Sequence, residues 1–422
     1  MSLTGSDSGG TKKELTESYY LDTSHPLTSR KLDEFLEEAC LKNDDRYMTW
    51  VNPYEKMSHK EFYTKAMVLA KGLLAIGMKR GDTFCSFGSQ GSDPVLLLIA
   101  CASLGIKYTA NYLYAPIGNV IRMMITRIKP NAVLVGNCTS GKRQELACAE
   151  FIKVIEDISK THPHGIEHII YDRKAANDPL CNIQDGWSSL ASIYELGEKI
   201  SDEVLREAKE KVVQQSQSYI YVHHPTNTAI QNGSTGEPKI VLLNARNMAN
   251  AAFHGQQRNS NYGAVTFGVN DIMEGDVKLI LVTFSCLATG NNAVIYPATN
   301  TPDDLAAITE ILAATEKYKI QLMIHRADYV VKIANNLSYK DQYDLKSLSA
   351  LVIGGYLSSP ELKQKLAAFA PYSMDGYGGT EFLNSIDPAP ISLLPPEKIN
   401  TVGKPATNVE MKIVNEMVRL CQ

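Results

Sequence analysis

Short apolar runs alternate with amphipathic segments along most of the chain, and this alternation restricts the fold more than any other feature. The runs at 82–87 and 131–136 have the length and content of buried strands. Segment 58–77 has helical periodicity, and Ser58 followed three residues later by Glu61 is the capping-box pattern of a helix N-terminus. Short buried strands that alternate with helices favour parallel sheets covered on both faces, so the pattern predicts an α/β protein.

The remaining elements follow from the same periodicities. A length of 422 residues exceeds one ordinary core, so two or three domains are expected. Further strands are expected at 47–51, 278–284, 292–298, 320–325 and 349–355, and further helices at 31–42, 93–105, 144–159, 201–215, 302–318 and 327–336.

Composition and charge argue against several classes of protein. A formal net charge of −4 gives no basic footprint for nucleic acid. The longest apolar run, which begins at Pro94, is too short to span a bilayer, and the N-terminus lacks the apolar core of a signal peptide. The eight cysteines show no CxxC pair and no metal-ligand spacing, which favours reduced thiols and a cytoplasmic location.

Two loops are candidates for holding a phosphate. The first, GNCTSGKR at 136–143, follows an expected strand and matches the GxxxxGK pattern, in which Lys142 would reach the outer phosphates. Arg143 stands where a serine or threonine should hold magnesium. A surface turn is therefore the favoured interpretation of this loop, and an unrelated nucleotide-binding site the less favoured one.

The second loop reads GSTGEPK and runs from Gly233 to Lys239. A proline before the lysine excludes a Walker A loop, because glycine must occupy that place. The glycines at 233 and 236 still allow a bent backbone and a close approach to a ligand. Ser234 and Thr235 add hydroxyl donors, and Lys239 adds a positive charge. Taken alone, the loop is either a phosphate grip or a simple turn.

Other segments decide between these interpretations. DGYGGTEF at 375–382 resembles the Tyr-Gly-x-Thr-Glu motif of the adenylate-forming superfamily, which includes acyl-CoA synthetases, coumarate-CoA ligases, luciferases and peptide-synthetase adenylation domains. NGSTGEPK at 232–239 resembles the phosphate loop of that superfamily. The segment at 351–369 is similar to its Gly-Gly adenine loop, 401–416 to its Val-Gly-Lys-Pro segment, and 57–90 to its N-terminal block. These segments occur in the order and at the spacing typical of the superfamily.

The resemblance, which extends from about Tyr47 to the chain end, implies an acid–thiol ligase. Such an enzyme joins a carboxylate to the α-phosphate of ATP, releases pyrophosphate and transfers the acyl group to the thiol of coenzyme A. Both reactants of the first step are anions, so positioning and charge neutralisation would supply most of the catalysis. The resemblance implies Ser234, Thr235, Gly236 and Lys239 for the β- and γ-phosphates, Thr380 for the α-phosphate, Glu381 for Mg²⁺, Tyr377, Gly354, Gly355 and Tyr356 for adenine, and Gly233, Gly378 and Gly379 for the rest of the nucleotide site.

The chain departs from the family pattern in several places. Ile240 replaces the glycine after the lysine, Asn244 and Ala245 replace a Thr-His pair, and Ser285 replaces a histidine near the acyl group. The family's ribose-binding aspartate, its hinge and its small C-terminal domain with an adenylation lysine would lie beyond Gln422. We therefore expect an impaired enzyme, and the alternative is a catalytically inactive nucleotide-binding or scaffold relative.

The resemblance also predicts the architecture and the substrate class. It implies two doubly wound αβ subdomains stacked on each other and the start of a small β-rich subdomain, without the C-terminal small domain. The acyl pocket is expected within about 253–355, whose content favours a small or medium carboxylic acid. Neither a nucleic acid partner nor a transmembrane segment is expected, and the oligomeric state is left open. The expected parts are a flexible tail at 1–28, an N-terminal αβ subdomain at 29–215, a nucleotide- and acyl-binding αβ subdomain at 216–386 and the β-rich start at 387–422.

Overall fold

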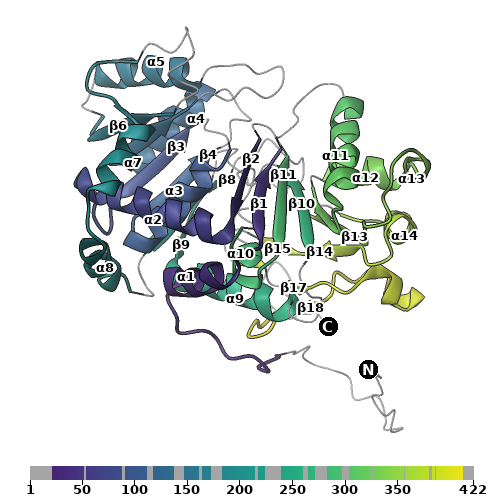
Figure 1. Ribbon diagram of the computed structural model, residues 1–422. Helices are drawn as coiled ribbons and strands as arrows, with labels where there is room; N and C mark the ends of the chain where they lie inside the picture. The colour runs from purple at the N-terminus through teal and green to yellow at the C-terminus, as the bar shows by residue number, and fades with distance from the viewer. Residues whose placement is uncertain are drawn as a thin grey trace, which may run out of the picture.

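Two seven-stranded sheets, each flanked by helices, dominate the structure (Figure 1). The α/β class predicted from the alternation of apolar runs is therefore confirmed. The computed structural model describes residues 21–51, 54–87, 91–111, 117–136, 147–160, 164–172, 183–213, 217–223, 239–259, 265–270, 283–296, 304–325, 327–355, 357–379, 383–384 and 386–411.

The first sheet is parallel except at one edge, and we call it the β3 sheet. Its order is β7-β6-β5-β3-β4-β8-β9, and the β8–β9 pair is antiparallel. β3 and β5 are buried at every residue, which explains their continuous apolar sequences, because a strand covered on both faces has no solvent side. The strands are β3 (Thr83–Phe87), β4 (Lys107–Asn111), β5 (Ala132–Val135), β6 (His168–Tyr171), β7 (Ser188–Ser189), β8 (Gln217–His223) and β9 (Lys239–Asn244).

The second sheet, which we call the β10 sheet, has the order β14-β13-β12-β10-β11-β1-β2. It is parallel except for the antiparallel β1–β2 pair at its edge. Strands far apart in sequence meet here, since Met48 of β1 pairs with Ala293 of β11. The strands are β1 (Tyr47–Trp50), β2 (Glu55–Ser58), β10 (Thr266–Asn270), β11 (Asn292–Tyr296), β12 (Leu322–Ile324), β13 (Ala350–Gly354) and β14 (Met374–Gly376).

The helices begin and end largely where local signals place them. Ser58 and Glu61 form the predicted capping box, with Ser58 Oγ accepting from the Glu61 N–H at 3.1 Å and Glu61 Oε2 accepting from the Ser58 N–H at 2.7 Å. The helices are α1 (Leu32–Lys42), α2 (His59–Ala75), α3 (Asp93–Leu104), α4 (Ile117–Met123), α5 (Ala147–Ser159), α7 (Leu190–Glu198), α8 (Asp202–Glu210), α9 (Ala245–Asn259), α10 (Ser285–Thr289), α11 (Asp304–Tyr318), α12 (Ala327–Ala334), α13 (Tyr339–Gln342) and α14 (Pro360–Phe369).

One hydrophobic cluster joins the two sheets. It contains Trp50 and Phe267 of the β10 sheet, Phe84 and Tyr108 of the β3 sheet, and Phe62 of α2. The Trp50 and Phe62 rings stack with their centroids 5.8 Å apart. Helices α1, α2, α3, α9 and α10 contribute most of the other members, so they form the layer that connects the sheets (Figure 1).

Two short hairpins follow the β10 sheet. β15 (Gly378–Gly379) pairs with β16 (Leu383–Asn384), and β17 (Ile386–Asp387) pairs with β18 (Lys404–Pro405), both antiparallel. The expected strand at 278–284 lies outside the described residues except for its last two positions, which lead into α10. The expected domain boundaries remain predictions. Within the described residues, no helix combines the length and apolar content needed to cross a membrane.

Candidate nucleotide site and adjoining cavity

The carboxyl ends of β13 and β14 bring two of the predicted motifs together. The strands are parallel neighbours, and Gly354 pairs with Gly376, the residue before Tyr377. A Cβ atom at Gly354 would lie 3.3 Å from the Gly376 carbonyl oxygen, so the close approach of the strands favours glycine. Gly355 has a φ of +65°, a left-handed conformation that glycine adopts at little cost. The predicted adenine residues Gly354, Gly355 and Tyr377 therefore lie at one edge of the sheet, where α/β proteins commonly bind ligands.

The β15–β16 hairpin continues directly from this edge. Gly378 pairs with Asn384, and Gly379 pairs with Leu383. The side chain of Tyr377 is half-exposed, at 48%. Residues 380–382, which include the predicted Thr380 and Glu381, lie outside the described residues, as does Tyr356.

The predicted phosphate loop connects two described strands. Lys239 is the first residue of β9 and pairs with His223, the last residue of β8. The loop residues Gly233, Ser234, Thr235 and Gly236 lie outside the described residues, and so does Lys142 of the competing loop. The structure thus fixes the strand ends that flank the loop.

A buried ion pair supports the strand that leads into Tyr377. Lys363 Nζ of α14 lies 3.0 Å from Asp375 Oδ2 of β14, and the two side chains are 1% and 5% exposed. Lys363 Nζ also donates to the carbonyl oxygen of Thr401 at 2.8 Å. Lys363 of α14 therefore joins β14 to the backbone at Thr401, and Asp375, its partner on β14, lies two residues before Tyr377. The sequence gives little signal for this pair, because a lysine on an amphipathic helix is usually exposed.

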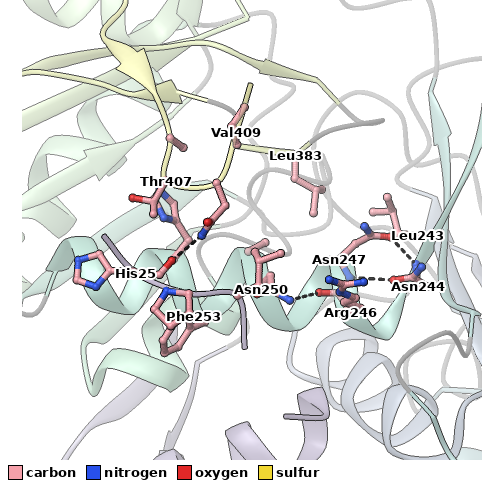
Figure 2. A pocket seen from close by; sticks show the side chains of 16 residues that line it. His25, Leu243, Asn244, Arg246, Asn247, Asn250, Phe253, Leu383, Thr407 and Val409 are labelled. Atoms are coloured by element: carbon pink, nitrogen blue, oxygen red, sulfur yellow. Dashed lines mark hydrogen bonds between the residues drawn. The ribbon is translucent and has the colours of Figure 1, made fainter. Parts of the chain in front are cut away.

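A cavity of about 400 Å³ lies next to the β15–β16 hairpin (Figure 2). Its walls come from the N-terminal segment at 25–27, from α9 and the end of β9, from Leu383, and from residues 406–409. In Figure 2, Leu383 and Leu243 lie at one end and His25 and Phe253 at the other, with Asn250 between them. The sequence predicted none of these lining residues as a ligand site, although Phe253 begins the range expected for the acyl pocket.

Asparagine side chains hold the walls of the cavity in place. Asn250 of α9 accepts from the Thr28 N–H at 2.8 Å and donates back to the Thr28 carbonyl at 3.3 Å. Asn408 donates from its backbone N–H to the Asp22 carbonyl at 2.6 Å and from Nδ2 to the His25 carbonyl at 2.5 Å. We call residues 22–28 the strap, because these bonds fasten the segment across α9 and residues 406–409.

α9 begins with a reciprocal asparagine cap. The Asn247 N–H donates to Asn244 Oδ1 at 2.9 Å, and the Asn244 N–H donates to Asn247 Oδ1 at 3.1 Å. This arrangement has the geometry of a capping box, and it satisfies backbone donors at the helix start. Asn244, which appeared in the sequence as a departure from a Thr-His pair, thus has a local structural role.

One histidine in the cavity wall is oriented by a carboxylate. His254 Nε2 lies 3.2 Å from Asp387 Oδ1, and their side chains are 16% and 35% exposed. An ionised carboxylate only accepts, so Nε2 is the ring nitrogen that donates in this contact. The cavity wall therefore combines apolar side chains with an oriented imidazole.

The described cysteines do not contribute to either site. Cys40, Cys85, Cys101 and Cys286 are free and buried, and burial raises the pKa of each thiol, for Cys40 to about 12. Buried thiols of this kind are inert rather than nucleophilic. No group of three or more His, Cys, Asp or Glu side chains could hold a metal ion within the described part of the chain.

The sequence matches one family model over almost its whole length. The family is described as AMP-binding enzyme, and the match covers residues 36–421. A mitochondrial medium-chain acyl-CoA ligase of Danio rerio is 25% identical over 419 residues, which is 95% of this chain and 64% of that protein. A mitochondrial short-chain-family acyl-CoA synthetase of Dictyostelium discoideum is 22% identical over 388 residues, or 86% of this chain and 51% of that protein. The chain thus spans about half to two thirds of the length of these relatives.

Solved structures share the fold at low identity. A long-chain-fatty-acid-CoA ligase of Archaeoglobus fulgidus superposes with a TM-score of 0.73 at 18% identity, covering 95% of this chain and 74% of that one. A luciferase-like enzyme from the mealworm Zophobas morio gives 0.69 at 18% identity, covering 95% and 85%. The likeness to both structures extends across the two sheets.

Proposed function

Because the chain belongs to the AMP-binding enzyme family, we propose that it activates a carboxylic acid with ATP and passes the acyl group to coenzyme A. The observation that supports the proposal is the pairing of β13 with β14, in which Gly354 lies opposite Gly376, the residue before Tyr377. The named acyl-CoA ligases among the relatives support the reaction class.

The adenine ring is held at the ends of these two strands. Gly355 has no side chain to obstruct a flat ligand, and nothing described lies within 4 Å of the position that its Cβ would take. The half-exposed ring of Tyr377 offers an aromatic surface for stacking, a contact worth about 1–3 kcal/mol per base in other proteins. A planar base fits between an open glycine backbone and such a ring.

The phosphates bind to the residues implied by sequence. Ser234, Thr235, Gly236 and Lys239 hold the β- and γ-phosphates, and Thr380 holds the α-phosphate. Glu381 holds Mg²⁺, whose preference is for oxygen ligands, and the ion neutralises phosphate charge when it is bound. In the first step a carboxylate oxygen forms a bond to the α-phosphorus as the bond to pyrophosphate breaks. In the second step a thiolate attacks the acyl carbon and AMP leaves.

A second candidate is a relative that binds nucleotide without performing this chemistry. It is favoured by the departures around β9, where Ile240 follows Lys239 and Asn244 serves as a helix cap in place of the Thr-His pair. Both candidates require a nucleotide site, and they differ only in turnover. The expected cytoplasmic location, like the choice of acid, belongs to this proposal.

Calorimetric titration of ATP and of AMP tests the nucleotide site. We expect Lys239→Ala to weaken ATP binding about tenfold or more, because a charge-assisted contact contributes roughly 1.5–3 kcal/mol, and to change AMP binding little. Lys142→Ala is the matched control and should leave both affinities unchanged. Equal losses for ATP and AMP in Lys239→Ala would contradict the phosphate assignment, and a loss in Lys142→Ala would favour the competing loop.

Carboxylate-dependent exchange of pyrophosphate into ATP then separates the two candidates. An enzyme gives exchange that rises with the concentration of an accepted acid. A relative that only binds nucleotide gives normal AMP affinity and no exchange with any acid of a broad panel.

A further inference from the structure

The strap forms a thin wall of the cavity. His25, Pro26 and Leu27 line the cavity, and in Figure 2 His25 lies at the same end as Phe253. All three strap residues are also exposed to solvent, Leu27 to 50%. Within the described part of the chain, the strap is therefore a wall one residue thick between this end of the cavity and solvent.

The strap is held by few contacts. Residues 22–28 contain no helix or strand, and none of them belongs to a hydrophobic cluster of the described residues. Hydrogen bonds fasten the segment instead, to Asn250 near one end and to Asn408 near the other. One hydrogen bond shifts an equilibrium by only about three- to tenfold, so these fastenings can open while the core stays intact.

The fastening at Asn408 is compact. Asn408 holds the carbonyl oxygens of Asp22 and His25 through its backbone N–H and its Nδ2, at 2.6 and 2.5 Å. Thr407 Oγ1 adds a contact of 3.4 Å with Asp22 Oδ2. Asn408 has a φ of +63°, a left-handed conformation that asparagine adopts more readily than most residues. All these bonds come from two neighbouring residues, so one local change can release this end of the strap.

The other end of the strap leads into a firmly held residue. Arg30 Nη2 lies 2.7 Å from Glu38 Oε2 and donates to the Glu34 carbonyl oxygen at 3.0 Å. The guanidinium group also lies 5.4 Å from the centre of the Phe35 ring. These partners all belong to α1. A movement of the strap must therefore bend the chain between Thr28 and Arg30, and a few residues at the end of an element commonly serve as a hinge.

We propose that the strap is a lid over the cavity, hinged between Thr28 and Arg30 and latched at Asn408, and that release of the latch admits molecules that the closed strap excludes. Asn408 follows β18 closely, whereas the wall opposite the strap belongs to α9. A shift of residues 406–409 away from α9 would release the lid while α9 stays in place. The inference goes beyond the proposed function, because it concerns access to the cavity and holds whatever enters it.

Thiol labelling of Ala251→Cys, in the cavity wall on α9, measures this access. The two reagents are N-ethylmaleimide, which is small, and fluorescein-5-maleimide, which is bulky. Each rate is divided by the rate of the same reagent with glutathione, and mass spectrometry of the peptide that carries residue 251 separates it from labelling of the native cysteines. We expect the bulky reagent to react about tenfold or more slowly than the small one, because the two fastenings together favour the closed strap by at least that factor.

Two substitutions at Asn408 release the latch in the Ala251→Cys background. Asn408→Gly removes the side-chain donor, and glycine keeps the left-handed backbone at little cost. Asn408→Asp keeps the shape and places an acceptor against the His25 carbonyl oxygen. We expect each to speed the bulky reagent about three- to tenfold and to leave the small reagent nearly unchanged. Asn335→Gly, which removes an exposed asparagine after α12, is the matched control and should change neither rate.

Equal normalised rates of the two reagents in Ala251→Cys would overturn the proposal, because the cavity would then be accessible with the strap in place. A bulky-reagent rate that is the same in the latch variants and in Asn335→Gly would also overturn it. A rise of both reagents by the same factor would indicate general loosening of the fold instead of a lid. Thermal unfolding checks that each variant is folded, and Asn408→Asp decides if Asn408→Gly is not. Labelling needs neither nucleotide nor acid, so its result leaves the test of the proposed function independent.

Discussion

His59 is a residue whose burial makes the stability of the protein depend on pH. It is the first residue of α2, and its side chain is fully buried. Burial lowers the pKa of its imidazole from 6.5 to about 4, with a smaller contribution from the positive charge of Arg46, and the backbone of Asn291 opposes the shift only in part. The unfolded chain therefore binds a proton at a pH where the folded chain does not.

The sign of the effect follows directly. This contribution to stability is complete above about pH 6.5, where neither state is protonated, and it is lost as the pH falls from 6.5 towards 4. The loss is up to about 3 kcal/mol, since one pKa unit corresponds to about 1.4 kcal/mol. Urea unfolding at several pH values should show a smaller decrease in His59→Phe than in the unmodified chain. An identical pH dependence in both would show that His59 is not the group responsible.

The Lys363–Asp375 pair makes a second prediction at the residue scale. Lys363→Met leaves the Asp375 carboxylate buried without its ionic partner, and breaking a buried pair in this way costs about 3–5 kcal/mol. We expect the double variant Lys363→Met with Asp375→Leu to recover most of that loss, because no charge then remains buried. Unfolding free energies of the two single variants and the double variant give the measurement. Additive losses would mean that the pair is not coupled.

At the scale of elements, Gly403 determines whether β18 can pair with β17. It has a φ of +124°, and a Cβ atom there would lie 2.1 Å from the Asp387 carbonyl oxygen. Gly403→Ala therefore adds a backbone clash to the strain of a positive φ. Gly81→Ala is the matched control, since its φ is +93° and nothing lies within 4 Å of its Cβ position.

We expect Gly403→Ala to destabilise the protein clearly more than Gly81→Ala, which should cost about 1–3 kcal/mol, as a strained backbone conformation does elsewhere. Thermal or urea unfolding compares the two. If both variants lose the same stability, backbone strain alone accounts for the effect of Gly403→Ala. The clash with the Asp387 carbonyl would then have been relieved by a shift of β17.

Local signals predicted most elements, and tertiary pairing accounts for what they missed. The capping box of Ser58 and the buried strand at 131–136 depend on neighbours in sequence, so they could be identified without a structure. The pairing of β1 with β11 could not, because it joins residues more than 240 positions apart. The burial of Lys363 depends on the same kind of contact, since its partners lie on β14 and at Thr401.

The candidate site shows the same division. The Gly-Gly and Tyr-Gly-Gly motifs could be recognised in the sequence, and β13 and β14 bring them to one edge. The cavity could not be predicted, because its walls come from residues 25–27, α9 and residues 406–409. These segments are far apart in the sequence, and no sequence pattern indicates that they meet. The phosphate assignments at Lys239, Thr380 and Glu381 stay predictions that the binding experiments test.

At the scale of the whole molecule, the two sheets share a core, and their stabilities should be coupled. One cluster contains both Trp50 of the β10 sheet and Phe84 of the β3 sheet. A separate cluster on the other face of the β3 sheet contains Phe87 and Phe151, with Trp187 against it. β3 contributes to both clusters, because successive side chains of a strand point to opposite faces. Unfolding of the core that the two sheets share should therefore also unfold the cluster on the other face of β3.

The two tryptophans of the sequence make this coupling measurable. Trp187→Phe leaves Trp50 as the reporter of the core that the two sheets share. Trp50→Phe leaves Trp187 as the reporter of the cluster around Phe87 and Phe151, which we call the outer cluster. We expect the urea transitions of the two fluorescence signals, each compared with circular dichroism of the same variant, to coincide, since coincident transitions indicate one cooperative unit. If Trp187 loses its native signal at clearly lower urea than the circular dichroism of its own variant, the outer cluster unfolds separately. The clusters on the two faces of β3 would then be less strongly coupled than the continuous burial of this strand predicts.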